Sequence, residues 1–110
     1  MLRLKTGARI GGLRPEVLFA IQVAQSVWLK HGAEELVVTS AADGKHQRGS
    51  EHYAFLAVDL RTHNLGLPAT RKAVCAELAE RLGPDYDVIF EGENTPSEHC
   101  HLEFDPKEPK

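Results

Sequence analysis

The 110-residue chain has no long apolar segment and no excess of basic residues. Its most apolar stretch, residues 17–29, is interrupted by Gln22, Gln25 and Ser26, so we expect neither a transmembrane helix nor the apolar region of an export signal. The formal net charge of −3 at pH 7 gives no electrostatic basis for binding nucleic acid. The sequence therefore predicts no membrane partner and no nucleic-acid partner.

Cysteine is scarce, and no internal repeat or low-complexity segment is present. The two cysteines, Cys75 and Cys100, form no C-x-x-C pair, and we expect both to be small residues that point into the core. Hydrophobic residues make up 42% of the chain and charged residues 26%, which is typical of a globular protein with a single modest core. We expect one monomeric domain over residues 1–110, with a flexible tail at 104–110.

Hydrophobic spacing predicts two helices and several short strands. In each helix apolar residues recur every three or four positions, a Pro stands in the first turn and a Gly follows the end. The strands are short runs that are β-branched or alternate between apolar and polar residues. The predicted helices are 14–31 and 67–82; the predicted strands lie at 35–40, within 52–61, at 85–91 and at 98–104, and 1–13 favours a short strand or an arm. The fold class is therefore α+β, with about four strands in a small, mostly antiparallel sheet and two helices packed on one face.

Two stretches of the chain carry residue types that bind metals. His52 and Asp59 are seven positions apart, a spacing that suits a loop leading into a strand better than one face of a helix. Asp59 lies in the apolar run AVDL, where a carboxylate needs a partner or a metal because burying it alone is costly. His101 can supply a third ligand, and Glu98 can accept a proton from water. Three such ligands and an open position for water make a catalytic zinc site.

The last predicted strand carries further candidate residues. Strict alternation places His99, His101 and Glu103 on one face, which makes His99 a rival ligand, or a group that contacts substrate and stabilises charge in the transition state. Glu103 can hydrogen-bond a ligating His. Cys100 points to the opposite face, and Glu98 needs a bend or bulge in the strand to reach the site of His101.

These residues carry a family resemblance. The run SEHYAFLAVD at 50–59 resembles the S-x-H-x-x-G-x-A-x-D signature of the zinc D-Ala-D-Ala carboxypeptidase and dipeptidase family, which includes phage L-alanyl-D-glutamate endolysins. The run EHCHLE at 98–103 resembles the second signature of that family, E-x-x-H-x-E. The resemblance implies the hedgehog/DD-peptidase fold, which the hedgehog signalling domain shares. The implied ligands of one zinc ion (Zn2+) are His52, Asp59 and His101, and the implied general base is Glu98.

Two departures from the signatures concern substrate binding. Phe55 occupies the position of the signature Gly, and Asp43 stands where many relatives carry an Arg that holds the substrate carbonyl. The candidates for substrate contacts or for support of the metal ligands are Lys45, His46, Arg48, Ser50, Arg61, His99 and Glu103. Arg61 shares a strand face with Asp59, so it either orients that carboxylate or forms an ordinary salt bridge. His46 is either a site residue or a surface His.

The resemblance implies a zinc-dependent peptidase that hydrolyses D-amino-acid-containing bonds in the stem peptides of bacterial peptidoglycan. It does not distinguish a DD-carboxypeptidase from a dipeptidase or an L-alanyl-D-glutamate endopeptidase. Without an export signal, such a protein is expected to stay in the cytoplasm until it is released or delivered to the cell wall, as in phage or prophage lysis. The alternative is a non-catalytic zinc-binding interaction module of the same fold, in which His99 or His46 fills the fourth position. A metal-dependent nuclease is disfavoured by the negative net charge.

Overall fold

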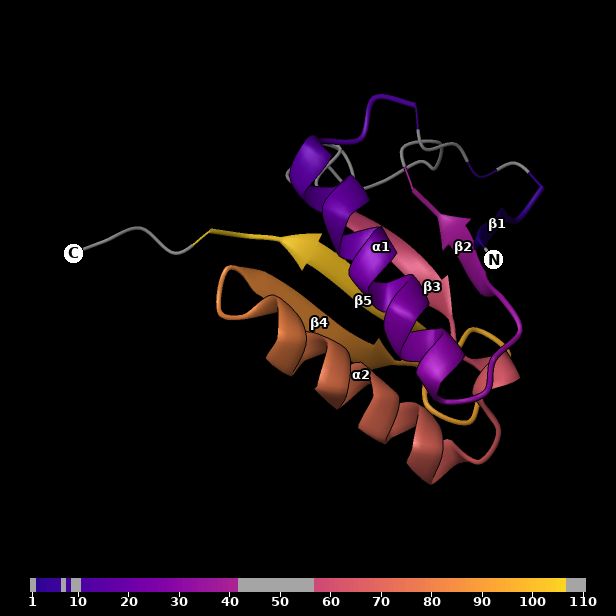
Figure 1. The fold of residues 1–110 in the computed structure, drawn as a ribbon. Helices are drawn as coiled ribbons and strands as arrows, with labels where there is room; N and C mark the ends of the chain where they lie inside the picture. The colour runs from indigo at the N-terminus through magenta and orange to yellow at the C-terminus, as the bar shows by residue number, and fades with distance from the viewer. Residues whose placement is uncertain (1, 7, 9–10, 42–56, 107–110) are drawn as a thin grey trace.

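The computed structural model describes residues 2–6, 8, 11–41 and 57–106, which contain two α-helices, one short 3-10 helix and five strands (Figure 1). The strands are β1 (Leu2–Leu4), β2 (Leu36–Ser40), β3 (Ala57–Arg61), β4 (Tyr86–Glu91) and β5 (His99–Phe104). The helices are α1 (Pro15–Lys30), the short η1 (His63–Leu65) and α2 (Pro68–Leu82). Both predicted helices, and the predicted strands at 35–40, 85–91 and 98–104, begin one residue later than expected.

The five strands form one mixed sheet in the order β1-β2-β3-β5-β4. β1 runs parallel to β2, and every other pair of neighbours is antiparallel. The prediction of a small α+β domain with a mostly antiparallel sheet is confirmed, while the expected four strands become five. The additional strand is β1, whose three residues are all exposed and show no alternation. It is a strand because it pairs with β2, where Leu2 lies opposite Leu36. The spacing of hydrophobic residues could not predict this pairing.

Helix α1 buries one apolar stripe against the sheet. Val17, Ile21, Ala24 and Trp28 recur at helical spacing and are buried, as expected. The Trp28 Nε1–H group donates a hydrogen bond to the carbonyl oxygen of Arg61, at 3.1 Å. This bond ties the C-terminal half of α1 to the last residue of β3, and so fixes the backbone at Arg61.

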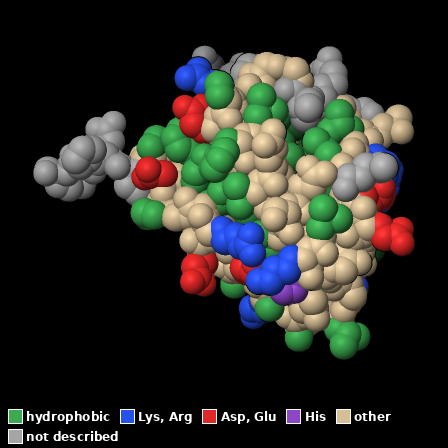
Figure 2. Space-filling view, viewed as in Figure 1, with side chains coloured by type: hydrophobic (Ala, Val, Ile, Leu, Met, Phe, Trp, Pro, Cys, Tyr) green, Lys and Arg blue, Asp and Glu red, His purple; other side chains and the backbone are tan. Residues whose placement is uncertain are grey.

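Helix α2 packs beside α1 on the same face of the sheet (Figure 1). Val74, Cys75 and Leu78 are buried in it, whereas Ala73 is exposed. The Glu77 carboxylate pairs with Arg81 at 2.8 Å, one helical turn further along α2. It also binds Lys30 at 3.0 Å and His31 at 2.8 Å, at the end of α1. Figure 2 shows the resulting group of basic side chains between the two helices. Within the described residues, neither helix has the length and hydrophobicity needed to cross a membrane.

The two faces of the sheet differ in chemistry. The side chains of β3 and β5 on the helix-covered face are fully buried in the core: Val58, Leu60, Cys100 and Leu102. Because side chains alternate along a strand, the remaining residues project from the opposite face. We call this opposite face the polar face; it carries Asp59, Arg61, His99, His101 and Glu103. All five are half-buried. The predicted alternation in the last strand is therefore confirmed.

The C-terminal tail begins later than predicted. Phe104 is the last residue of β5, and its ring centroid lies 5.1 Å from that of Tyr86. The Asp105 N–H group donates to the carbonyl oxygen of Asp85 at 2.8 Å. Residues 104 and 105 are therefore held by the sheet, and residues 107–110 lie outside the described part of the chain.

Candidate metal centre and adjoining pocket

Pairing of β3 with β5 brings two of the predicted ligands into contact. Asp59 lies directly opposite His101 in the antiparallel register. The distance between Asp59 Oδ1 and His101 Nδ1 is 2.9 Å, although 42 positions separate the two residues in the sequence. Their side chains are only 20% and 16% exposed, respectively. Two donors of the types that zinc prefers are thus held side by side on a regular sheet.

The geometry of this pair fits a zinc ion. A tetrahedral zinc with bonds of 2.0–2.1 Å holds neighbouring ligand atoms about 3.3 Å apart, so the observed separation needs only a small adjustment. On the other side of the imidazole ring, His101 Nε2 lies 2.8 Å from Glu103 Oε1. Glu103 thus contacts the His101 ring on the side opposite Asp59, the place from which a carboxylate can orient the ring.

His101 lies between two carboxylates, and this placement governs its protonation in the metal-free protein. The hydrogen bond to Asp59 is the largest cause of a pKa raised from 6.5 to about 9; burial opposes the shift and the hydrogen bond to Glu103 adds to it. Because the folded pKa is raised, the stabilisation is fully present below pH 6.5 and is lost as the pH rises through about 9.

We therefore expect the ring protons of His101 in the metal-free protein to titrate with a pKa of about 9 in an NMR experiment. An Asp59→Asn variant should lower this pKa, because it removes the charge that favours the imidazolium ion. A wild-type pKa at or below 6.5 would show that the two carboxylates do not hold the proton.

His99, the rival ligand, lies on the same face but has other partners. Its Nε2 is 3.6 Å from Asp59 Oδ1 and 2.9 Å from Glu91 Oε1, and its Nδ1 is 2.7 Å from the carbonyl oxygen of Ser97. Among the described residues, His99, Asp59 and His101 do not bring three donor atoms within 4.8 Å of one another. In this metal-free arrangement His99 is a neighbour of the contact between Asp59 and His101. The predicted site residues Lys45, His46, Arg48, Ser50 and His52 lie outside the described residues.

Glu98, the predicted base, projects to the helix-covered side. Its side chain is fully buried, and its carboxylate accepts hydrogen bonds from the Thr62 hydroxyl at 2.6 Å and from the Asn94 backbone N–H at 3.0 Å. Arg71 Nη1, from α2, donates to both carboxylate oxygens at 3.2 and 3.4 Å. Burial raises the pKa of this carboxyl, but the bonds from Thr62 and Asn94 and the charge of Arg71 outweigh it, so the pKa is lowered. Glu98 precedes β5, which begins at His99 and pairs with β3 in regular register.

A pocket of about 510 Å³ opens beside Asp59. Its walls come from the residue after β1, from β2 and β3, and from the turn that precedes β5. The polar and charged residues that line it include Lys5, Thr39, Asp59, Arg61, His63, Glu98 and His99. Lys5 was not predicted as a site residue, because only the parallel pairing of β1 with β2 places it near β3.

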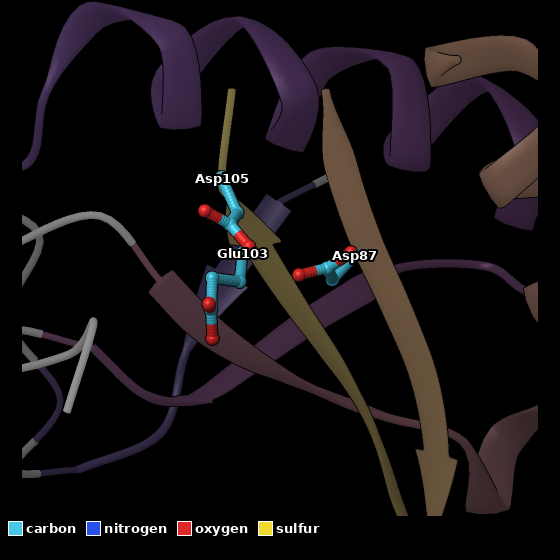
Figure 3. A group of neighbouring side chains, drawn as sticks. All are labelled: Asp87, Glu103 and Asp105. Carbon is cyan, nitrogen blue, oxygen red and sulfur yellow. The ribbon is translucent and has the colours of Figure 1, made fainter. Parts of the chain in front are cut away.

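A second cluster of possible ligands lies at the other end of β5. Carboxylate oxygens of Asp87, Glu103 and Asp105 all lie within 4.8 Å of one another, as Figure 3 shows. Sequence reasoning missed Asp87 and Asp105, although Asp87 is the cross-strand partner of Glu103. Such a cluster could hold a cation, but exposed and half-buried acids gather without one in many proteins.

Comparisons with known proteins add no family to these observations. No protein-family model matches the chain, no curated protein matches it, and no solved structure matches its fold.

Proposed function

We propose that this protein is a zinc-dependent peptidase of the hedgehog/DD-peptidase fold, acting on D-amino-acid-containing bonds of peptidoglycan stem peptides. The contact between Asp59 Oδ1 and His101 Nδ1, at 2.9 Å, carries the proposal. It supports the proposal because the family resemblance of the sequence implies both residues as ligands, and they come from stretches that are distant in the chain. The small α+β architecture and the pocket beside Asp59 are compatible with it.

In this proposal His52, Asp59 and His101 hold one zinc ion. When bound, zinc would supply Lewis acidity that polarises the scissile carbonyl and lowers the pKa of the attacking water towards 7. Glu103 holds the His101 ring in the orientation that turns Nδ1 towards Asp59. His99 borders the pocket next to Asp59, and its ring would have to exchange its contact with Glu91 to donate a hydrogen bond to a substrate carbonyl.

Glu98, the predicted base, lines the pocket beside Asp59, and its carboxylate is bound to Thr62 and Arg71 in this metal-free structure. To accept a proton from water on the polar face, its carboxylate must first leave Thr62 and Arg71. In its present position it joins the turn before β5 to α2 and to the residue after β3. We therefore propose that Glu98 is a positioning residue, which sets where β5 begins and hence where His101 meets Asp59.

The position of Glu98 also favours the second candidate function, a non-catalytic zinc-binding interaction module. A zinc site that only stabilises a fold needs no base, and a carboxylate locked among Thr62, Asn94 and Arg71 supplies none on the polar face. The two functions share His52, Asp59 and His101 as ligands and differ in the fourth position, which is open to water in the peptidase and filled by His99 or His46 in the module. They are therefore distinguished by whether the zinc-loaded protein turns over substrate.

The test is hydrolysis of purified stem peptides, followed by mass spectrometry. We expect the zinc-loaded protein to cleave a bond next to a D-residue, a chelator to abolish cleavage and added zinc to restore it. A His101→Gln variant should lose at least about a hundredfold in rate, since even supporting residues around a metal contribute 10–100-fold. His31→Gln, on the helix-covered side, is the matched control and should retain activity. If the wild type binds one zinc ion and cleaves no stem peptide, the interaction module is the better description.

A further inference from the structure

The two cysteines of the chain meet in the core between α2 and the sheet. Cys75 lies in α2 and Cys100 in β5, and both are free thiols. They belong to the same buried cluster of side chains, although β4 lies between them in the sequence. Their thiol groups are hydrogen-bonded to each other. The fold therefore brings the only two sulfhydryl groups of the protein into contact.

A second contact determines how α2 lies along β5. Arg71 Nη1 donates a hydrogen bond to Glu98 Oε1 at 3.2 Å. Cys75 follows Arg71 by four helical residues, which is roughly 6 Å along a helix axis. Cys100 follows Glu98 by two residues, which is roughly 7 Å along an extended chain. Because the two distances nearly agree, the ion pair and the thiol pair are successive contacts between the same two segments.

Both thiols are held on regular, well-packed elements. Cys100 lies in a strand with neighbours on both sides, opposite Leu60 of β3 and Phe90 of β4. In α2, Val74 and Leu78 are fully buried and fix the side of the helix that faces the sheet. Two groups held in place by a rigid scaffold react as if each were present at a high concentration near the other. In the unfolded chain the same sulfurs meet only when the intervening loop closes, at a cost in entropy.

We propose that Cys75 and Cys100 are an oxidation site, at which a small-molecule disulfide closes an intramolecular disulfide bond that links α2 to β5. The inference goes beyond the proposed peptidase and does not depend on it, because both thiols lie on the helix-covered side of the sheet. The bond would nevertheless hold the strand that carries the candidate metal ligand. His101 directly follows Cys100 and projects from the polar face.

The reaction is an exchange of thiols and disulfides with a reagent such as oxidised glutathione. Cys75 reacts first, because 4% of its surface is exposed and Cys100 has none. Its sulfur loses a proton and attacks one sulfur of the reagent, which gives a mixed disulfide and releases one glutathione. Cys100 then loses its proton and attacks the sulfur of Cys75, and the second glutathione leaves. The protein loses two electrons and two protons, and one oxidised glutathione becomes two reduced ones.

The burial of both thiols makes the exchange slow in the native protein. A reagent as large as glutathione reaches Cys75 only when α2 opens locally. We therefore expect closure to be faster in urea concentrations below the unfolding transition. Once the bond is closed, the same cover hinders attack by reducing thiols, and the sulfurs need only approach from contact to about 2.05 Å.

The experiment brings the full-length, metal-free chain to equilibrium with mixtures of reduced and oxidised glutathione, both in buffer and in urea that unfolds it. After an acid quench the free thiols are alkylated and counted by mass spectrometry; the reduced chain has two and the closed chain none. We expect the equilibrium constant for closure to be about 100-fold or more larger in the folded protein than in the unfolded one. The closed protein should melt about 10 °C or more above the reduced one.

Cys75→Ala and Cys100→Ala are the matched controls, since each keeps one thiol and cannot close the bond. Neither should melt at a higher temperature after treatment with oxidised glutathione. The comparison of folded with unfolded wild type needs neither variant, so the test holds even if one of them fails to fold.

Equilibrium is approached both from the reduced protein and from protein refolded in the oxidising mixture, so slow exchange cannot imitate a negative result. Equal constants for closure in the folded and unfolded protein would overturn the proposal. So would a folded chain that at equilibrium keeps both thiols, carries glutathione on Cys75, or forms its disulfide with a second chain.

Discussion

Replacing Glu98 by Gln is expected to lower the free energy of unfolding by about 3 kcal/mol, measured by urea denaturation of the metal-free protein. The Glu98 side chain is completely buried, and that of its partner Arg71 is only 18% exposed. Gln keeps the shape of Glu but leaves the guanidinium group without a counter-charge, and breaking a buried ion pair in this way usually costs 3–5 kcal/mol. Arg71 is partly exposed, so we expect the lower end of that range.

The decrease in the free energy of unfolding caused by Glu98→Gln should become smaller as the pH falls. The folded pKa of Glu98 lies below its ordinary value of 4.5, mainly because hydrogen bonds and Arg71 outweigh the effect of burial. A lowered carboxyl pKa contributes stability that is present above the unfolded value and is lost as the pH falls through the folded value. The wild type should therefore lose part of its advantage over Glu98→Gln in acid, and the two stability curves should converge.

Glu93→Gln is the matched control for this prediction. Glu93 lies in the same turn before β5 but is exposed, so its replacement should change stability by no more than about 0.5 kcal/mol. A Glu98→Gln protein that is as stable as the wild type, binds zinc and has lost its catalytic rate would contradict the positioning role. That outcome would assign Glu98 the role of the general base, which its place in the second signature predicts.

The case of Glu98 shows where sequence reasoning reached its limit. The pairing of Asp59 with His101 could be expected, because two strands with correct alternation need only the right register to bring these residues together. The environment of Glu98 could not be expected from the sequence, because Thr62 follows a different strand and Arg71 lies on a helix. No periodic pattern in the sequence relates those positions to residue 98. They are brought together only when α2 packs against the sheet.

The pocket and the acidic cluster illustrate the same limit. Lys5 reaches the pocket because β1 pairs in parallel with β2. This position could not be predicted, because β1 is too short to show a hydrophobic pattern. Asp87 meets Glu103 only through the register of β4 against β5. Hydrophobic spacing predicted β2, β3, β4 and β5, and it predicted the buried side of β5. It carries no information about which strands are neighbours, and the members of a site depend on that.

Asp59→Asn is expected to weaken zinc binding by at least about 100-fold, measured by competition with a chelating dye at fixed pH. Asn has nearly the shape of Asp and can still hydrogen-bond to His101, so the sheet should remain intact. The substitution removes the negative charge and turns the carboxylate oxygen that lies 2.9 Å from His101 Nδ1 into part of a neutral amide, which is a much weaker zinc ligand. Zinc would then lose the one charged ligand among its three protein ligands, whereas loss of a supporting residue alone costs 10–100-fold.

His99→Gln separates a ligand from a neighbour in the same measurement. His99 Nε2 is 3.6 Å from Asp59 Oδ1, and both of its ring nitrogens already have closer partners in Glu91 and Ser97. Its replacement should therefore weaken zinc binding by less than about tenfold, well below the cost expected for a ligand. If His99→Gln and Asp59→Asn weaken zinc binding by the same factor, His99 is one of the zinc ligands. If Asp59→Asn leaves zinc affinity unchanged, the contact between Asp59 and His101 is an ordinary ion pair. That contact would then no longer support the proposal of a zinc peptidase.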